Sequence, residues 1–309
     1  MTFKAWLFTT AFAAMAAFSC TKDHNIEKKE IFTELDSEIG KVTDSIYIVP
    51  RPQWGTLDGE KDVRAWFPLR WDYMGSVNQG MAVYGDTAVV LCNKGWVRIL
   101  NLKKEKVVQE TVLASFSETN HANTAQFGRK ENPSDKLPLL YVSECTSPCR
   151  CFVERYTGDG FELVQEISTD MGVIDWIADA SEGFIYSYEH GGRRDSMVIR
   201  RFHLPDPSGV DVELRREDAL ATWRFGVTYP HTIQGGTILN GTLIMTYGTT
   251  TRPRGLHFID LERGELKDLD LTGDLDVEPE DIDIWRGHII MYAFAGSLFT
   301  IMKLKGYAG

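Results

Sequence analysis

The sequence lacks the short motifs that mark several large enzyme classes. It contains no G-x-S-x-G, no H-E-x-x-H and no G-x-x-x-x-G-K-[ST], which disfavours a serine hydrolase, a zincin and a P-loop enzyme. It also lacks a long block of lysine and arginine, and 44 acidic residues outnumber 33 basic ones, for a formal net charge of -11. Because phosphate binding requires a concentrated basic surface, we expect no nucleic-acid partner.

An apolar run long enough to span a bilayer is also missing, since a helical span needs about 20 residues. The uncharged stretch 5–18 follows Lys4 and is shorter than that, which predicts a signal peptide over residues 1–19. Ser19 directly precedes Cys20, and this pair resembles a bacterial lipobox. The resemblance implies cleavage before Cys20, lipidation of its thiol and attachment to the outer membrane. A plain secretory signal is the alternative.

Residues 20–44 are polar and mixed in charge, which is typical of a flexible tether. Lys22 and Asp23, close behind Cys20, resemble the surface-export signal of Bacteroidetes lipoproteins. The sequence leaves open whether the chain occupies the surface or the periplasmic face of the membrane. We expect the folded domain over residues 45–309.

An internal repeat predicts the fold. Segments of similar pattern begin at residues 79, 123, 175, 234 and 280, about 50 residues apart, which is the length of a four-stranded propeller blade. Each segment leads into an apolar run typical of a buried strand, at 88–91, 139–142, 184–186, 243–245 and 289–291. Fourth strands fit 107–112, 161–167, 210–214 and 266–271.

We therefore predict an all-β chain with a single five-bladed β-propeller over residues 45–309. The last unit has room for three strands only, so the N-terminal strand 45–49 is expected to complete it and close the ring. A β-sandwich is the structural alternative, but its strand spacing does not reproduce a unit of this length.

Three cysteines fall at one predicted turn, namely Cys145, Cys149 and Cys151. In an exported protein a disulfide is expected, either from Cys145 to Cys151 or from Cys145 to Cys149. Cys92 stands in an apolar strand and is expected to pack there.

The first residue of each repeat segment is polar, and the innermost strands of a propeller line its central channel. Alternation along a strand places a residue and the one two positions earlier on the same side. We predict a ligand site at one mouth of the channel, with the following candidate binding residues: Gln79, His121, Asn123, Asp175, Trp176, His231, Gln234, Glu278 and Glu280.

The aromatic residue Trp176 is the predicted platform for a sugar ring, because sugars are held by ring faces together with polar groups. Other interpretations of the same residues stay open. Polar residues of a narrow channel can simply bond one another and ordered water, and most propeller aromatics fill the core between blades.

The first functional hypothesis is a binding module. A lipid-tethered, acidic propeller with imidazoles and carboxylates at its mouth would capture a glycan or another small polyol for an uptake system. A scaffold for envelope protein partners is the alternative if side chains plug the channel.

The second hypothesis is a glycoside hydrolase. The five-bladed fold with channel carboxylates resembles the arabinanase-like glycoside hydrolases, which implies an acid and a base, here Asp175 with Glu280 or Glu278. That family uses an aspartate base on its first blade, where this sequence has Gln79, so no catalytic role is carried over. A loop carboxylate such as Asp72 could act instead.

A third hypothesis is metal-assisted lactone or ester chemistry, in the manner of propeller lactonases and lyases. His121, His231, Glu278 and Glu280 are the candidate ligands of a divalent cation in the channel. Their oxygens suit Ca²⁺ or Mg²⁺ and their imidazoles suit Zn²⁺.

Overall fold

A computed structural model describes residues 61–68, 78–172, 174–189, 196–226, 232–239, 241–249, 251–273, 275, 277–286, 288–293 and 298–304. The predicted signal peptide, Cys20, the tether and the strand at 45–49 lie outside these residues, as do Asp72 and His231. Among the described residues, no helix is long and apolar enough to cross a membrane.

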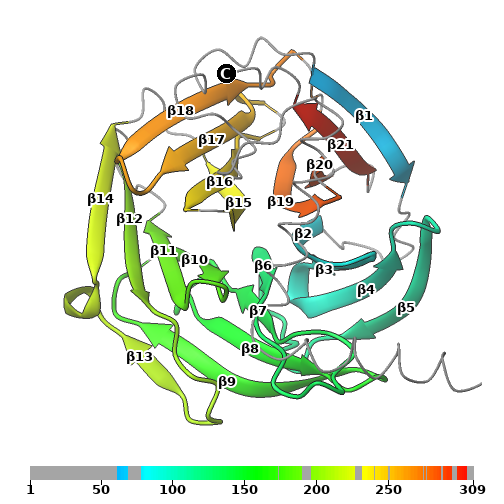
Figure 1. Cartoon of the computed structure of the whole chain (residues 1–309), viewed down its shortest axis with the longest axis vertical. Coiled ribbons are helices and arrows are strands. Elements are labelled where there is room, and N and C mark those ends of the chain that lie inside the picture. The colour runs from blue at the N-terminus through cyan, green and yellow to red at the C-terminus, as the bar shows by residue number, and fades with distance from the viewer. Residues whose placement is uncertain are drawn as a thin grey trace, which may run out of the picture.

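The strands form five sheets arranged around a common centre (Figure 1). The first sheet contains β2 (Asn78–Tyr84), β3 (Thr87–Cys92), β4 (Trp96–Asn101) and β5 (Lys106–Val112). The second contains β6 (Thr124–Phe127), β7 (Leu140–Ser143), β8 (Cys151–Tyr156), β9 (Phe161–Thr169) and β13 (Val212–Leu214). The third contains β10 (Ile174–Asp179), β11 (Phe184–Glu189), β12 (Ser196–His203) and β14 (Ala221–Gly226).

The fourth sheet contains β15 (Ile233–Leu239), β16 (Thr242–Tyr247), β17 (Gly255–Asp260) and β18 (Glu265–Asp270). The fifth contains β19 (Pro279–Trp285), β20 (His288–Ala293), β21 (Leu298–Leu304) and β1 (Lys61–Pro68). Two short 3-10 helices complete the described elements, η2 (Asn93–Gly95) and η3 (Arg216–Asp218). This radial arrangement of sheets, antiparallel apart from the pairing of β13 with β9, is a β-propeller.

The five predicted repeat segments coincide with β2, β6, β10, β15 and β19, which lie nearest the centre (Figure 1). Each of these inner strands contacts the inner strand of the next sheet around the ring. The repeat therefore placed the centre of the fold correctly.

The second strand of each sheet is mostly apolar because both of its faces are buried. In β3, Val89 packs with Phe127 of the second sheet, whereas its neighbour Val90 packs with Tyr292 of the fifth. Successive side chains of a strand point to opposite faces, so a strand between two packed sheets reads as a continuous apolar run. The core is accordingly divided into clusters between adjacent sheets.

Two predictions about outer strands need correction. The fifth sheet receives its outer strand from β1, whose Lys61 lies opposite Leu304 of β21, while the predicted strand 45–49 lies outside the described residues. Within 210–214, the strand β13 pairs in parallel with β9 of the second sheet, and β14 is the fourth strand of the third sheet. The side-chain amide of Gln165 on β9 holds the connection there by donating to the carbonyl of Val210 at 2.8 Å.

The inner strands approach one another so closely that a side chain has no room at Gly235. A Cβ atom there would lie 2.2 Å from Oδ1 of Asp281 and 2.7 Å from the carbonyl oxygen of Glu280. The glycine is therefore required by packing at the centre.

We predict that Gly235→Ala lowers the free energy of unfolding by about 1–3 kcal/mol, because the added methyl group overpacks the centre. Gly273→Ala is the matched control, since no atom lies within 4 Å of a Cβ at that position, and it should change stability by less than about 0.5 kcal/mol. Urea unfolding of the two variants measures the difference. Equal stabilities would contradict the close packing described here.

Candidate functional site

Three inner strands contain one extra residue at the predicted ring position. The register with the second strand shifts between Asn78 and Met81 in β2, between Ile233 and Gly236 in β15, and between Pro279 and Asp281 in β19. Such β-bulges disrupt the ladder locally and re-aim side chains. The bulges therefore change which residue of each strand points at the centre.

In β19 the central residue is Asp281 rather than Glu280. The Asp281 carboxylate accepts hydrogen bonds from the backbone amides of Met81 on β2 and Ala125 on β6, at 2.8 and 3.1 Å. Gly235 of β15 lies against it, so this side chain touches four inner strands counting its own. It has 0% exposure, and burial raises its pKa well above the ordinary aspartate value while the backbone amides act in the opposite direction.

A second layer of polar side chains crosses the centre beside Asp281. Asp283 accepts hydrogen bonds from the Val83 amide at 2.8 Å and from the Thr237 hydroxyl at 3.2 Å. The side-chain amide of Gln126 donates to the carbonyl of Gly236 at 2.9 Å. The centre of the propeller is thus occupied by side chains that satisfy backbone groups of neighbouring strands.

Toward the predicted mouth, Asp175 is also enclosed. Its carboxylate accepts hydrogen bonds from the Asn123 amide at 2.9 Å and the Ser143 hydroxyl at 2.7 Å, and it has 0% exposure. Asn123 also donates to the carbonyl of Gln234 at 2.7 Å. Three predicted ring residues, Asn123, Asp175 and Gln234, therefore lie together. They are hydrogen-bonded to one another.

The Gln234 side chain extends this network to Glu278. Its amide nitrogen donates to Oε1 of Glu278 at 2.5 Å and to the carbonyl of Gly248 at 3.2 Å. Glu278 is half-buried, so it is the outermost member of the chain of contacts.

The other two ring residues, Glu280 and Gln79, are also buried, but they do not belong to the series of hydrogen bonds from Asp175 to Glu278. Glu280 is 4% exposed, and its pKa is raised to about 9, first by burial and then by the charges of Glu278 and Asp281. Glu280 is therefore protonated at neutral pH. Gln79 is 3% exposed, and its Oε1 has no hydrogen-bond partner within the part of the chain that the structure describes.

Trp176 does not offer a ring face to a ligand. The side chain is 1% exposed, its ring packs edge-on against Phe202 at 5.9 Å between centroids, and its Nε1 donates to the carbonyl of Cys149 at 2.9 Å. The prediction of a sugar platform at this residue is wrong, because the indole fills the core between the second and third sheets.

His121 is half-buried and stands in the loop that enters β6. The next residue, Ala122, has a φ of 47°, and its carbonyl accepts a hydrogen bond from the Gly80 amide at 2.9 Å. The loop is therefore fixed against β2. The predicted pairing of His121 with His231 falls partly outside the described residues.

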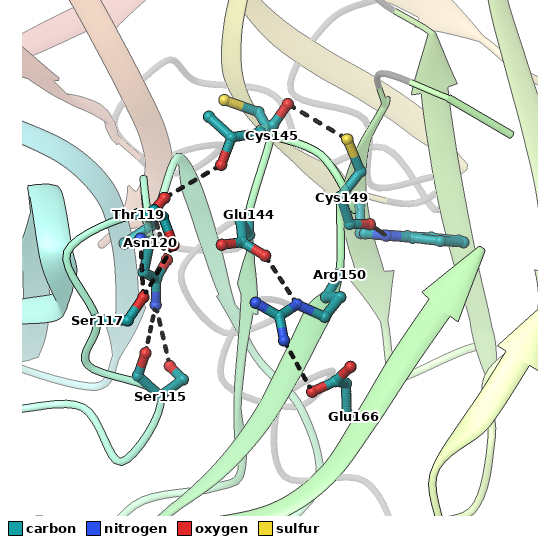
Figure 2. Close-up of polar contacts among 12 residues, drawn as sticks. Ser115, Ser117, Thr119, Asn120, Glu144, Cys145, Cys149, Arg150 and Glu166 are labelled. Atoms are coloured by element: carbon teal, nitrogen blue, oxygen red, sulfur yellow. Dashed lines mark hydrogen bonds and ion pairs between the residues drawn. The ribbon is translucent and has the colours of Figure 1, made fainter. Parts of the chain in front are cut away.

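Cys145, Cys149 and Cys151 are free thiols in the structure. The expected disulfide is therefore absent from it. The thiol of Cys149 donates to the carbonyl of Cys145 at 3.3 Å, and the sulfur atoms of these two residues point in different directions (Figure 2). Burial raises the pKa of all three thiols, which disfavours the thiolate that disulfide formation requires. Cys92 is also free and lies buried in β3, as expected.

No group of three or more His, Cys, Asp or Glu residues is placed to hold a metal ion among the residues that the structure describes. Of the candidate cation ligands, Glu278 and Glu280 are near each other. His231 lies outside the described residues.

The central carboxylates are the residues that the ring alignment missed. Asp281 and Asp283 alternate with the buried Ile282 and Ile284 along β19. Two carboxylates at alternate positions of an otherwise apolar inner strand are the signal that could have identified them, because such groups need buried donors.

Comparison with known proteins supports the fold. No family model matches the chain, and no curated protein matches it. The structure is similar to Myxococcus xanthus glutaminyl cyclase, with a TM-score of 0.50 and 11% identity over 80% of this chain and 98% of that one. It is also similar to the tail fibre of Staphylococcus aureus phage P68, with a TM-score of 0.52 and 10% identity over 80% of this chain and 52% of the fibre.

A weaker likeness, with a TM-score of 0.40 and 10% identity over 70% of this chain, is to Kuenenia stuttgartiensis hydrazine synthase, of which the match covers 61%. At these identities the likenesses to the cyclase and the tail fibre show the fold alone.

We predict that Asp281→Ala lowers the free energy of unfolding by about 3 kcal/mol or more, because it leaves buried backbone amides of β2 and β6 without an acceptor. Asp270→Ala is the matched control, since that carboxylate accepts from the exposed backbone amide of Thr272. Its effect should stay near 0.5 kcal/mol. Urea unfolding compares the two, and similar losses would contradict the central role of Asp281.

The stability of the chain should depend on pH through Glu280. In the folded chain Glu280 keeps its proton up to about pH 9, against an ordinary pKa of 4.5. Between these values the unfolded chain loses a proton that the folded chain keeps, so the free energy of unfolding falls as pH rises, by at most about 1.4 kcal/mol per pH unit.

Glu280→Gln removes this contribution, so its stability relative to the natural chain should increase from pH 5 to pH 9. Urea unfolding at pH 5, 7 and 8.5 measures the trend, with the exposed Glu265→Gln as the matched control. A stability difference for Glu280→Gln that does not change with pH would show that the group is ionised in the fold.

Proposed function

We propose that the chain is a lipid-anchored protein of the cell envelope whose propeller binds a glycan or small polyol and does not catalyse a reaction. In this proposal each of the five sheets is one blade, and pairing of β1 with β21 closes the ring. The observation that carries the proposal is the enclosure of both predicted catalytic carboxylates, Asp175 and Glu280.

A glycoside hydrolase needs one carboxylic acid and one carboxylate on either side of the scissile bond. Asp175 has no exposed surface, and its two oxygens bond Asn123 and Ser143, so it cannot contact a sugar or its attacking water without rearrangement of the inner strands. Glu280 retains a proton suited to an acid, but it is only 4% exposed, so it is as poorly placed as Asp175 to contact a sugar. A binding role requires no such partner.

The groups left at the mouth suit hydroxyl recognition. His121 and Glu278 are half-buried, and Glu278 is oriented by the Gln234 amide behind it. A fixed carboxylate and an imidazole can accept from and donate to neighbouring hydroxyl groups, which is how polar residues position a small ligand in a pocket.

The address rests on the sequence. A lipid at Cys20 and a tether over 20–44 would hold the propeller at the outer membrane, close to envelope proteins that would receive the captured glycan. The acidic net charge of -11 is consistent with a neutral ligand rather than a polyanion.

The test is titration calorimetry of the purified chain with linear hexasaccharides of glucose, xylose, mannose and arabinose, followed by chromatography of the sugars. We expect at least one to bind and to be recovered intact. His121→Ala and Glu278→Gln should each weaken that binding about fivefold to tenfold, the equivalent of one lost hydrogen bond. His203→Ala, an exposed histidine at the end of β12, is the matched control.

Recovery of shortened sugar would replace the binding proposal with the hydrolase. Failure of all four hexasaccharides to bind would leave the scaffold for envelope partners as the better account of a propeller with a filled centre.

A further inference from the structure

Three loops at the same mouth form one rigid unit, which we call the loop shelf. It consists of residues 93–95 between β3 and β4, 113–123 between β5 and β6, and 144–150 between β7 and β8. The Lys94 amide donates to the carbonyl of Asn120 at 2.6 Å, and the Thr146 hydroxyl donates to the carbonyl of Thr119 at 3.2 Å. Each loop is thus bonded to the next.

Buried polar groups support the shelf from below. The side-chain amide of Asn120 donates to the carbonyl of Ser115 at 3.0 Å, and Arg150 donates to the buried carboxylate of Glu144 at 2.9 Å and reaches Glu166 at 3.4 Å (Figure 2). These contacts fix the loops without using the groups on their outer side.

The shelf also holds unfavourable backbone conformations. Lys94, Ala122 and Cys149 have φ values of 72°, 47° and 59°, in the left-handed region that residues with a side chain avoid. Among the described residues only Glu105 and Arg286 share this feature, and both stand in turns beside strands. Backbone strain of this kind persists where the surroundings over-determine it, and it gathers at functional sites.

An aromatic pair stands at the outer end of the shelf. Trp96 at the start of β4 and Phe116 of the second loop meet edge-to-face, 5.4 Å apart with an interplanar angle of 78°. Phe116 is 37% exposed and Trp96 is half-buried. The other exposed large hydrophobic residues of the described chain are all valine or leucine. Phe116 is therefore an unusually exposed aromatic side chain within that part of the chain.

The exposed polar groups of the shelf are neutral hydroxyls together with one ion pair. Thr119, Thr146 and Ser147 are exposed hydroxyl residues, and the one lysine of the shelf, Lys94, is paired with Glu118 at 2.6 Å. An aromatic surface beside uncharged hydrogen-bonding groups fits a sugar ring, whose apolar face packs on aromatic carbon while its hydroxyls bond the rim. An anionic ligand would find no unpaired lysine here.

We infer that the loop shelf is a peripheral subsite for a sugar residue, built from Trp96, Phe116, Thr119 and Thr146. Because His121 belongs to the same loop as Phe116 and Thr119, a glycan bound at the axial mouth can extend along this loop onto the aromatic pair. The inference rests on the proposed function, and it specifies an extended oligosaccharide rather than a single polyol as the ligand.

The experiment compares each of the four hexasaccharides with its disaccharide by titration calorimetry. The subsite requires that the bound hexasaccharide has the higher affinity, and that Phe116→Ala lowers the hexasaccharide affinity by about tenfold while the disaccharide affinity stays unchanged. Thr119→Val, which removes an exposed hydroxyl that contacts Ser117 of the same loop at 3.4 Å, should lower the hexasaccharide affinity by about threefold. Trp223→Ala, at a half-buried tryptophan on the outer strand β14, is the matched control and should have no effect.

The outcomes separate the two proposals. If a hexasaccharide binds and Phe116→Ala and Thr119→Val both leave its affinity unchanged, the shelf subsite is wrong while the binding function stands. If Phe116→Ala lowers the disaccharide affinity equally, the residue acts on the mouth and the extended subsite is wrong. If none of the sugars binds, the binding function is wrong and the subsite is wrong with it.

Discussion

The structure depends on the hydrogen bonds that the Asp281 carboxylate accepts from the backbone of β2 and β6. Inner strands of adjacent sheets face one another across the centre without forming a ladder, so their inward amides need other acceptors. Asp281 and Asp283 supply these acceptors to β2, and Asp281 supplies one to β6. A buried carboxylate is costly unless it receives several donors, and the inner strands provide donors that would otherwise be unpaired.

This arrangement limits what the centre can do. A carboxylate that holds backbone amides cannot also bind a substrate without releasing them, and the same reasoning applies to Asp175 between Asn123 and Ser143. Space is limited as well, since Gly235 is required where β15 passes Asp281. The predicted site residues that keep some exposure therefore lie at the mouth, where His121 and Glu278 are only half-buried.

The sequence predicted the inner strands well because each one is followed by a second strand that is buried on both faces and mostly apolar. This pattern recurs once per sheet. It did not predict which residue of β19 faces the centre, because the bulge at Glu280 adds one residue and a shift of one residue exchanges the two faces of a strand. The sequence also did not predict that β13, within 210–214, joins the second sheet. Its parallel pairing with β9 leaves no periodic signal in the sequence. Trp176 was misjudged for another reason: its neighbour Asp175 faces the network while the indole faces the core, as alternation requires.

The polar networks of the centre and of the loop shelf differ in what their partners are. At the centre, side chains end on backbone amides of strands, so a change of conformation would separate sheets. On the shelf, loops bond to loops, and exposed side chains such as Phe116 and Thr119 project from a backbone that is already fixed. The apolar clusters between sheets include the shelf residues Ala122 and Cys149, so packing against the sheets holds these left-handed residues at the mouth. A preorganised backbone of this kind loses little conformational entropy when a ligand binds, which is the advantage that would offset its strain.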